Sequence, residues 1–191
     1  MLKLKSILMV VAMLTMVGFF NTSYAEEQVV FPSYIVEHAK EASDLTGQPL
    51  ERILAVLLKE NRAFDPNLVS KTNDYGLMQI NKSNHKTFRN CGFDNIYDPR
   101  QNIIFGAMML QWAEEGVGSN EDYILMTYNM GGRRAKQAWD KGTRSSEYSR
   151  AVRENIKNKD TWVTDKGVAV INRNTGMTFA EALIDYMSIY V

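Results

Sequence analysis

The sequence predicts a mostly α-helical domain with a short β element and a small C-terminal extension. Apolar side chains between residues 50 and 58 recur at the spacing of one buried helix face. Asp98-Pro99-Arg100-Gln101 is a strong helix start, because Asp98 can cap the helix and Pro99 suits its first position. Strand-like patterns are confined to two short runs, residues 76–80 and 162–171.

The first 25 residues have the pattern of a secretory signal peptide. Lys3 and Lys5 precede an apolar run over residues 7–20, and Ser23-Tyr24-Ala25 offers a cleavage site of small residues. The alternative is a membrane anchor, but a span needs about 20 apolar residues and this run is shorter. We therefore expect cleavage after Ala25 and export to the periplasm, cell wall or extracellular medium, with no stable membrane insertion afterwards.

Charge and composition exclude several classes of function. The chain has 22 basic and 22 acidic side chains, and loss of Lys3 and Lys5 with the signal peptide leaves a small acidic excess. A nucleic-acid-binding protein normally has a basic excess, so no nucleic-acid partner is expected. His38 and His85 lie far apart without neighbouring ligands, so no metal site is predicted. Cys91 is the only cysteine, which excludes an internal disulfide.

The first half of the mature chain predicts two helices, then turns. One helix should run from Ser33 toward Leu45 and stop at Gly47, and Pro49 should open the next. The inner face of this second helix is formed by Leu50, Ile53, Leu54, Leu57 and Leu58. Asx and proline residues after residue 60 indicate turns, and residues 76–80 predict a bent extended segment. A short helix over residues 83–90 should follow.

The second half predicts four more helices and a distinct tail. The helix opened by Asp98, with Gln101 completing a capping box, should end at Gly116. A second capping box at residues 119–122 opens a helix that stops at Gly131, and further helices should cover residues 133–141 and 146–157. The tail predicts a hairpin around residues 165–167 and a final helix from Thr178. We divide the chain into a signal peptide (1–25), one domain (26–158) and an extension packed on it (159–191).

Glu60 is the main candidate for catalysis. On a helical wheel it points within roughly 20° of Ile53, at the edge of the apolar stripe and near the helix C-terminus. Burial and the negative end of the helix both disfavour a charged carboxylate, so both raise its pKa toward that of a general acid. Helix geometry alone leaves open an ordinary solvated glutamate at a helix end.

Four further segments follow Glu60 in order, and together they carry a resemblance. They are Phe64-Asp65-Pro66 with Val69-Ser70, Gly76-Leu77-Met78-Gln79-Ile80-Asn81, Asn102-Ile103 with Gly106, and Tyr128-Asn129-Met130-Gly131. With Glu60 they resemble the lytic transglycosylases of the soluble-transglycosylase (SLT) type, which are related to goose-type lysozyme. The resemblance covers residues 50–155, most of the mature chain.

The resemblance implies a lysozyme-like, helix-dominated fold with a groove for the glycan strands of peptidoglycan. It implies a glycosidic-bond lyase in which Glu60 protonates the bond between MurNAc and GlcNAc. Glu60 would then deprotonate the MurNAc 6-hydroxyl, giving a 1,6-anhydroMurNAc end without water or cofactor. We expect this enzyme to act as a monomer.

The same resemblance assigns roles to the other matched residues. Gly76 would let the backbone approach sugar or adopt a positive φ, and Gln79 would bond a sugar acetamido group or brace its loop. Met78 would line the subsite or fill core. Tyr128 would aim its hydroxyl at Glu60 or the substrate, with plain packing as the alternative, and Asn129 would brace the turn that ends the helix.

Two departures from the family pattern leave other functions open. Asn61 stands where most members have serine, and the interval from Glu60 to Phe64 is one residue longer than usual. A hydrolytic muramidase would need a second carboxylate, for which Asp65 and Asp74 are candidates. A non-catalytic peptidoglycan-binding protein is the other alternative.

Overall fold

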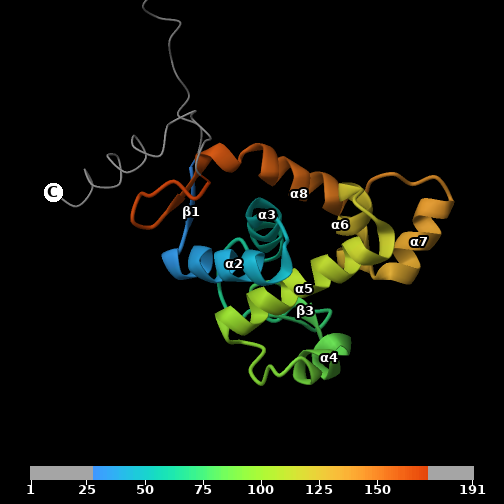
Figure 1. Cartoon of the computed structure of the whole chain (residues 1–191), viewed down its shortest axis with the longest axis horizontal. Helices are drawn as coiled ribbons and strands as arrows, with labels where there is room; N and C mark the ends of the chain where they lie inside the picture. The colour runs from blue at the N-terminus through green and yellow to red at the C-terminus, as the bar shows by residue number, and fades with distance from the viewer. Residues whose placement is uncertain (1–27, 172–191) are drawn as a thin grey trace, which may run out of the picture.

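A computed structural model of the chain describes residues 28–171 and arranges five longer helices around one another. Helix α3 (Leu50–Glu60) lies at the centre and is seen nearly end-on in Figure 1. Around it lie α2 (Ser33–Thr46), α5 (Pro99–Val117), α6 (Glu121–Met130) and α8 (Glu147–Lys157). Helix α7 (Gly132–Asp140) packs beside α6 at the edge of the molecule. The predicted signal peptide and the predicted helix from Thr178 lie outside the described residues.

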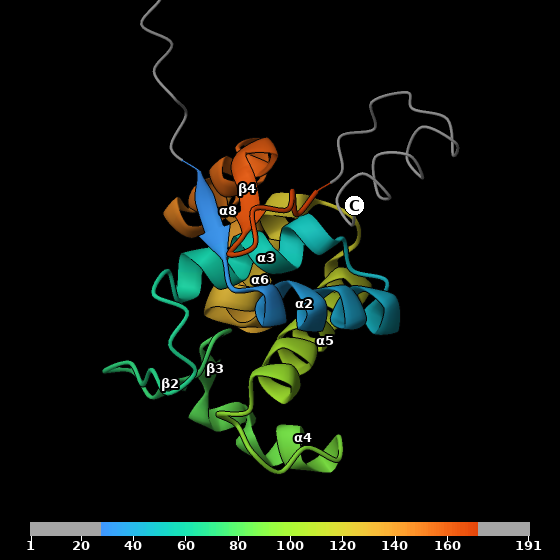
Figure 2. The same cartoon turned by 90° about the vertical axis from the view of Figure 1, so that its left-hand side faces the viewer.

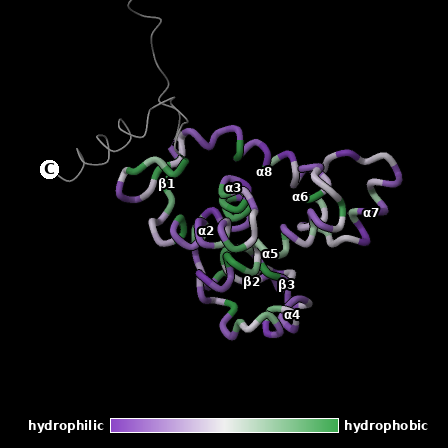
Figure 3. Tube along the Cα trace, viewed as in Figure 1, coloured by the Kyte–Doolittle hydropathy of each residue, from purple (hydrophilic) through white to green (hydrophobic). Residues whose placement is uncertain are grey.

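Helix α3 is more deeply buried than its apolar stripe predicted. Every residue from Arg52 to Leu58 is buried, and the hydropathy tube is green along this helix while much of the surrounding chain is purple (Figure 3). The prediction of one buried face was incomplete because α2, α5 and α8 all contact α3. A helix packed from several sides must be apolar nearly all round. The core of the domain therefore forms on α3, which also carries Glu60.

The predicted helix starts are partly confirmed. The Asp98 side chain accepts from the Gln101 N–H at 2.8 Å, so Asp98 is the N-cap as expected. The capping box is absent, because the Gln101 side chain turns to the backbone N–H groups of Asp94 and Asn95. The predicted box at residues 119–122 is also wrong, since the N-cap of α6 is Asn120.

Two predicted boundaries shift by one residue. Helix α5 continues through Gly116 to Val117, and Gly118 ends it with a φ of 79°. Pro49 is the residue before α3 rather than its first residue. A glycine at a helix end favours termination only where the chain leaves the helix with positive φ, and here Gly118 does so.

A small β element lies apart from the helical body. Strands β2 (Asp74–Tyr75) and β3 (Ile80–Asn81) pair antiparallel, and the 3-10 turn η1 (Lys82–Asn84) leads into α4 (His85–Asn90). In Figure 2 these elements lie below the helices. The bent extended segment predicted at residues 76–80 is instead a turn. Gly76 (φ 77°) and Gln79 (φ 47°) bend the chain too sharply for extended backbone.

A second strand pair joins the two ends of the described chain. Strand β1 (Val29–Phe31) pairs parallel with β4 (Trp162–Thr164), which follows the 3-10 turn η2 (Lys159–Thr161). Trp162 is buried edge-on against Phe31, with 5.4 Å between ring centroids. The hairpin predicted at residues 165–167 is present, since the Thr164 N–H donates to the Val168 carbonyl at 2.8 Å. Within residues 28–171, no helix combines the length and apolarity needed to cross a membrane.

Candidate active site

Glu60 is the last residue of α3 and has a half-buried side chain. The Tyr148 hydroxyl from α8 donates to Glu60 Oε1 at 2.6 Å. Burial raises the pKa of Glu60 to about 7, with a further upward contribution from the charge of Asp74; the Tyr148 hydrogen bond and nearby Lys59 act in the opposite direction. Within the described chain, Glu60 forms no ion pair. A carboxyl that is half protonated near neutral pH can both donate and accept a proton.

Tyr148 was not predicted as a site residue. It is buried in the first turn of α8, where the Ser146 side chain caps the helix and accepts from the Ser149 N–H. The Ser149 hydroxyl donates to Asp122 at 2.7 Å and thereby ties this turn to α6. Burial and then the charge of Glu60 raise the pKa of Tyr148, so its hydroxyl stays a donor. An aromatic residue just inside a capped helix start was the only local signal for this position.

Tyr128 does not bond Glu60, which corrects one expectation. Its hydroxyl donates to the Met78 carbonyl at 2.7 Å and so links α6 to the turn between β2 and β3. Burial raises its pKa first, followed by the charges of Glu60 and Asp74. Tyr128 therefore lies in the electrostatic field of Glu60 while it holds the neighbouring turn.

The turn at Gly76 is fixed by the buried side chain of Asn102. The Asn102 amide accepts from the Met78 N–H at 2.7 Å and donates to the Ile96 carbonyl at 2.8 Å. A Cβ atom on Gly76 would lie 2.8 Å from Asn102 Cγ, and the φ of Gly76 is positive. Glycine is thus required here for both conformation and space. The backbone at Gly76 therefore lies close to the Asn102 side chain, whereas the sequence had suggested a close approach to sugar.

Two matched residues of this turn have structural roles. Met78 is fully buried, and a Cβ atom on Gly106 would lie 2.7 Å from its side chain, so Gly106 leaves the room that Met78 fills. Gln79 donates through Nε2 to the Gly76 carbonyl at 2.8 Å and braces the loop. In this conformation Met78 therefore fills the core and Gln79 braces its loop, which were the alternatives to sugar contact for these two residues.

Asn61 connects Glu60 to the same turn. It is 2% exposed, donates to the Asp65 carbonyl at 2.6 Å and accepts from the Asp65 N–H at 3.1 Å. A longer contact reaches the Gly76 carbonyl at 3.3 Å. The amide thus closes the loop that follows Glu60, a role that a serine hydroxyl could fill only in part because it has a single donor.

Asp74 lies near Glu60 but is engaged by its own loop. Its carboxylate accepts from the Ser70 hydroxyl at 2.7 Å, from the Asn81 amide at 2.7 Å and from the Thr72 hydroxyl. Burial alone would raise its pKa, but the hydrogen bonds from Thr72, Asn81 and Ser70 outweigh it and lower the pKa. Asp74 therefore stays ionised and supplies a fixed negative charge.

The structure thus brings Glu60, Tyr148, Tyr128, Asp74 and the turn at residues 76–79 into one site. Asn129 is exposed, and its side chain has no hydrogen-bond partner among residues 28–171, so the expected bracing of the helix end is not seen. Across the same residues, no three acidic, histidine or cysteine side chains gather as a metal site requires.

The helical body, small β element and half-buried glutamate define a lysozyme-like, helix-dominated fold. Residues 37–151 match the family model described as the transglycosylase SLT domain. Because this match covers more than half of the chain, the protein belongs to the transglycosylase SLT domain family.

Two solved structures share this fold. One is an inactive mutant of the lytic transglycosylase Slt from Pseudomonas aeruginosa, with a TM-score of 0.57 and 19% identity over 74% of this chain and 26% of that one. The other is the 70 kDa soluble lytic transglycosylase from Escherichia coli, with a TM-score of 0.51 and 23% identity over 65% of this chain and 21% of that one. The chain therefore matches only about a quarter and a fifth of the lengths of these larger enzymes.

Proposed function

We propose that the protein is a peptidoglycan lytic transglycosylase with Glu60 as its single acid/base residue. The observation that carries this proposal is the environment of Glu60, whose pKa is raised to about 7 and which is held by a neutral hydroxyl rather than by a cation. Membership of the SLT domain family supports the same reaction. A general acid is most effective when its pKa lies near the working pH.

In the proposed reaction, Glu60 gives its proton to the glycosidic oxygen between MurNAc and GlcNAc as the bond to C1 breaks. The acetamido oxygen of MurNAc stabilises the positive charge that develops at C1, which replaces the second carboxylate of most glycosidases. The ionised Glu60 then takes the proton from the MurNAc 6-hydroxyl as that oxygen bonds to C1. The product is a 1,6-anhydro end, Glu60 is again protonated, and no water enters.

The other residues of the site position Glu60 in this mechanism. Tyr148 orients the carboxyl through its hydrogen bond and stabilises the ionised form between the two proton transfers. Tyr128 and Asn102 hold the turn at residues 76–79 beside it. The Gln79 Oε1 atom remains available to a sugar acetamido N–H, because its hydrogen bonds to the loop run through Nε2.

Hydrolysis is the second candidate, because Asp74 is a second carboxylate in the field of Glu60. An inverting hydrolase would use that carboxylate to take a proton from water. The lowered pKa of Asp74 and its three side-chain donors make it a weak base, which favours the single-carboxylate route. Binding without cleavage requires Glu60 to be unable to transfer protons, and its pKa argues against that.

Product analysis tests the proposal. The protein beginning at Glu26 is incubated with purified sacculi, and the released muropeptides are identified by mass spectrometry. We expect 1,6-anhydroMurNAc ends. Reducing ends would replace the proposal with hydrolysis, and sedimentation with sacculi without released fragments would replace it with binding alone. Export with cleavage after Ala25 is part of the proposal, and N-terminal sequencing of the exported protein tests it.

A further inference from the structure

The segment from Gly131 to Ser146 is strongly basic in a chain whose charges balance as a whole. We call these residues the basic segment; it comprises α7 and the loop that leads to α8. It contains five exposed cationic side chains and one acidic residue, Asp140. The cations are Arg133, Arg134, Lys136, Lys141 and Arg144. Since the whole chain has 22 charges of each sign, this surplus is local.

Most of this positive charge has no acidic partner. Lys136 pairs with Asp140 at 2.7 Å, which accounts for the one acidic residue. The Arg144 guanidinium lies 4.7 Å from the centroid of the Trp139 ring and donates to the Trp139 carbonyl, so it is held in place but not neutralised. Across residues 28–171, the side chains of Arg133 and Arg134 form no ion pair.

The segment is attached to α6 through its inner face. Ala135 is buried, and Trp139 stacks flat on Tyr123 of α6 with 4.3 Å between ring centroids. Repulsion among neighbouring cations opposes this arrangement, and no internal ion pair offsets it for the arginines. Unpaired guanidinium groups on an anchored helix are suited to an external anion, because each guanidinium can bind a carboxylate through two parallel hydrogen bonds.

The position of the segment indicates where that anion comes from. It begins three residues after Tyr128 and ends two residues before Tyr148, so both of its ends are attached to the site around Glu60. Helix α7, at nine residues, is only about 14 Å long. A strand bound at Glu60 would therefore lie within reach of the segment and could supply the anion. On a strand with intact stems the lactyl carboxyl of each MurNAc is bound in an amide, so the free carboxylates are those of the peptide stems.

We propose that the basic segment binds the carboxylates of the peptide stems on the strand being cleaved. The inference rests on the proposed function and adds a substrate preference to it: strands whose stems carry free carboxylates should be used better than strands whose stems are amidated. Arg133 and Arg134 are the binding residues in this proposal, because they are exposed and unpaired.

The experiment combines two substrates with two double variants. One substrate is glycan with intact stems, and the other is the same glycan after its stem carboxylates have been converted to amides; removing the stems with an amidase would instead expose a lactyl carboxylate on each MurNAc. The test variant is Arg133→Gln with Arg134→Gln. The control is Lys40→Gln with Lys166→Gln, which removes two exposed positive charges from α2 and from the hairpin at residues 165–167, on the opposite side of the molecule in Figure 1. KM and kcat are measured at low and high salt, and sedimentation with sacculi measures binding separately.

For the test variant we expect KM to rise about tenfold on strands with free stem carboxylates with kcat retained, and to stay unchanged on strands with amidated stems. The parent's preference for free stem carboxylates should shrink in high salt, and the control should match the parent. Equal losses on both substrates, or none on either, would overturn the inference. The inference would also be overturned if the test variant lost binding to polyphosphate or anionic vesicles but cleaved peptide-bearing strands as the parent does.

Failure of the proposed function would give a different result. In that case the parent releases no fragments from either substrate. Sedimentation still tests the basic segment, because the inference then requires the test variant alone to lose affinity for peptide-bearing sacculi. Equal binding of parent and variant would overturn it without reference to catalysis.

Discussion

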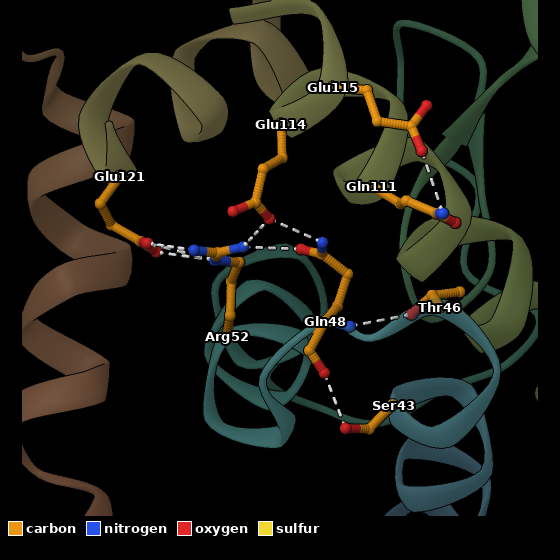
Figure 4. Close-up of polar contacts among 8 residues, drawn as sticks. All are labelled: Ser43, Thr46, Gln48, Arg52, Gln111, Glu114, Glu115 and Glu121. Carbon is orange, nitrogen blue, oxygen red and sulfur yellow. Dashed lines mark hydrogen bonds and ion pairs between the residues drawn. The ribbon is translucent and has the colours of Figure 1, made fainter. Parts of the chain in front are cut away.

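At the N-terminal end of α3, Arg52 holds two carboxylates, whereas at the C-terminal end Glu60 meets one tyrosine hydroxyl. Figure 4 shows the first centre: Arg52 contacts Glu121 at 2.6 Å and Glu114 at 2.8 Å, and Gln48 donates to the same oxygen of Glu114 at 2.8 Å. These contacts tie α3 to α5 and to the start of α6. Eight residues later on the same helix, Glu60 forms no ion pair with any of the described residues.

These different surroundings give Glu114 and Glu60 different pKa values. The Gln48 hydrogen bond, opposed by burial and reinforced by Arg52, lowers the pKa of Glu114, so this carboxylate stays ionised. Burial raises the pKa of Glu60, which can therefore exchange its proton. A surface pocket of about 270 Å³ adjoins Arg52 and Glu121. A pocket therefore lies at that end of α3, whereas the carboxyl that can exchange a proton lies at the other end.

The largest expected effect is on activity when Glu60 is replaced. Glu60→Gln keeps the size of the side chain and its ability to accept from Tyr148 but removes the transferred proton. Release of muropeptides should fall on the order of a hundredfold or more, with binding to sacculi retained. Glu51→Gln, at the first turn of the same helix, should leave the rate nearly unchanged. Loss of activity in Glu51→Gln with activity kept in Glu60→Gln would reverse the assignment.

The same variant should be the more stable protein at neutral pH. The folded pKa of Glu60, about 7, exceeds its ordinary value of 4.5, so the unfolded chain loses this proton first as the pH rises. Folding is therefore destabilised between about pH 4.5 and 7, by up to roughly 3 kcal/mol. Melting curves of parent and Glu60→Gln should nearly coincide near pH 4 and separate above it. A constant difference across this range would contradict the raised pKa.

At the other end of α3, Arg52→Met should cost stability rather than activity. It leaves Glu114 and Glu121 without their cation, but both side chains are about a third exposed, so we expect a loss of about 2 kcal/mol. The pKa of Glu114 is lower in the folded than in the unfolded protein, so ionised Glu114 stabilises the fold above about pH 4.5. This contribution disappears as the pH falls through the folded pKa. Denaturant unfolding should therefore show the deficit shrinking in acid. Rates per folded molecule should match the parent.

The contrast between these two ends was only partly predictable from the sequence. Helix period and the position at a helix end identified Glu60, because both are local properties. Tyr148 lies 88 residues away along the chain, and no local pattern indicates which helix will bring a hydroxyl to Glu60. Arg52 is buried although it is charged and lies outside the predicted apolar face. Its burial depends on acidic residues more than 60 positions later.

The amides that shape the site show the same limit. Asn61 and Asn102 are polar side chains that a sequence pattern assigns to the surface, yet both are almost completely buried. Each replaces backbone hydrogen bonds that the irregular turn at residues 76–79 cannot make for itself. The fold class followed from periodicity, whereas these contacts depend on which loops meet in three dimensions.

A smaller effect is expected from Tyr148→Phe, which removes the one side-chain donor to Glu60 among residues 28–171. Activity should fall about tenfold, because the carboxyl loses its fixed orientation. Since the hydrogen bond lowers the pKa of Glu60, its loss raises that pKa. The fall of kcat/KM with rising pH should therefore move to higher pH. Tyr128→Phe is the matched control: its hydroxyl bonds Met78, so it should lose about 1 kcal/mol of stability with the pH profile unmoved.

The smallest effect, and the one that separates the two candidate reactions, is expected from Asp74→Asn. The charge of Asp74 raises the pKa of Glu60, so its removal should move the fall of kcat/KM to lower pH, by less than about one unit. The loop should tolerate the amide, because the Ser70 and Thr72 hydroxyls can turn to accept from it. Asp65→Asn is the control, since its side-chain oxygen can still accept from the Asn67 N–H and no shift of the profile is expected. If Asp74 were instead the base of a hydrolase, Asp74→Asn would lose activity on the order of a hundredfold, and the parent's products would carry reducing ends. A modest shift of the pH profile with anhydro products retained is the result that the single-carboxylate mechanism requires.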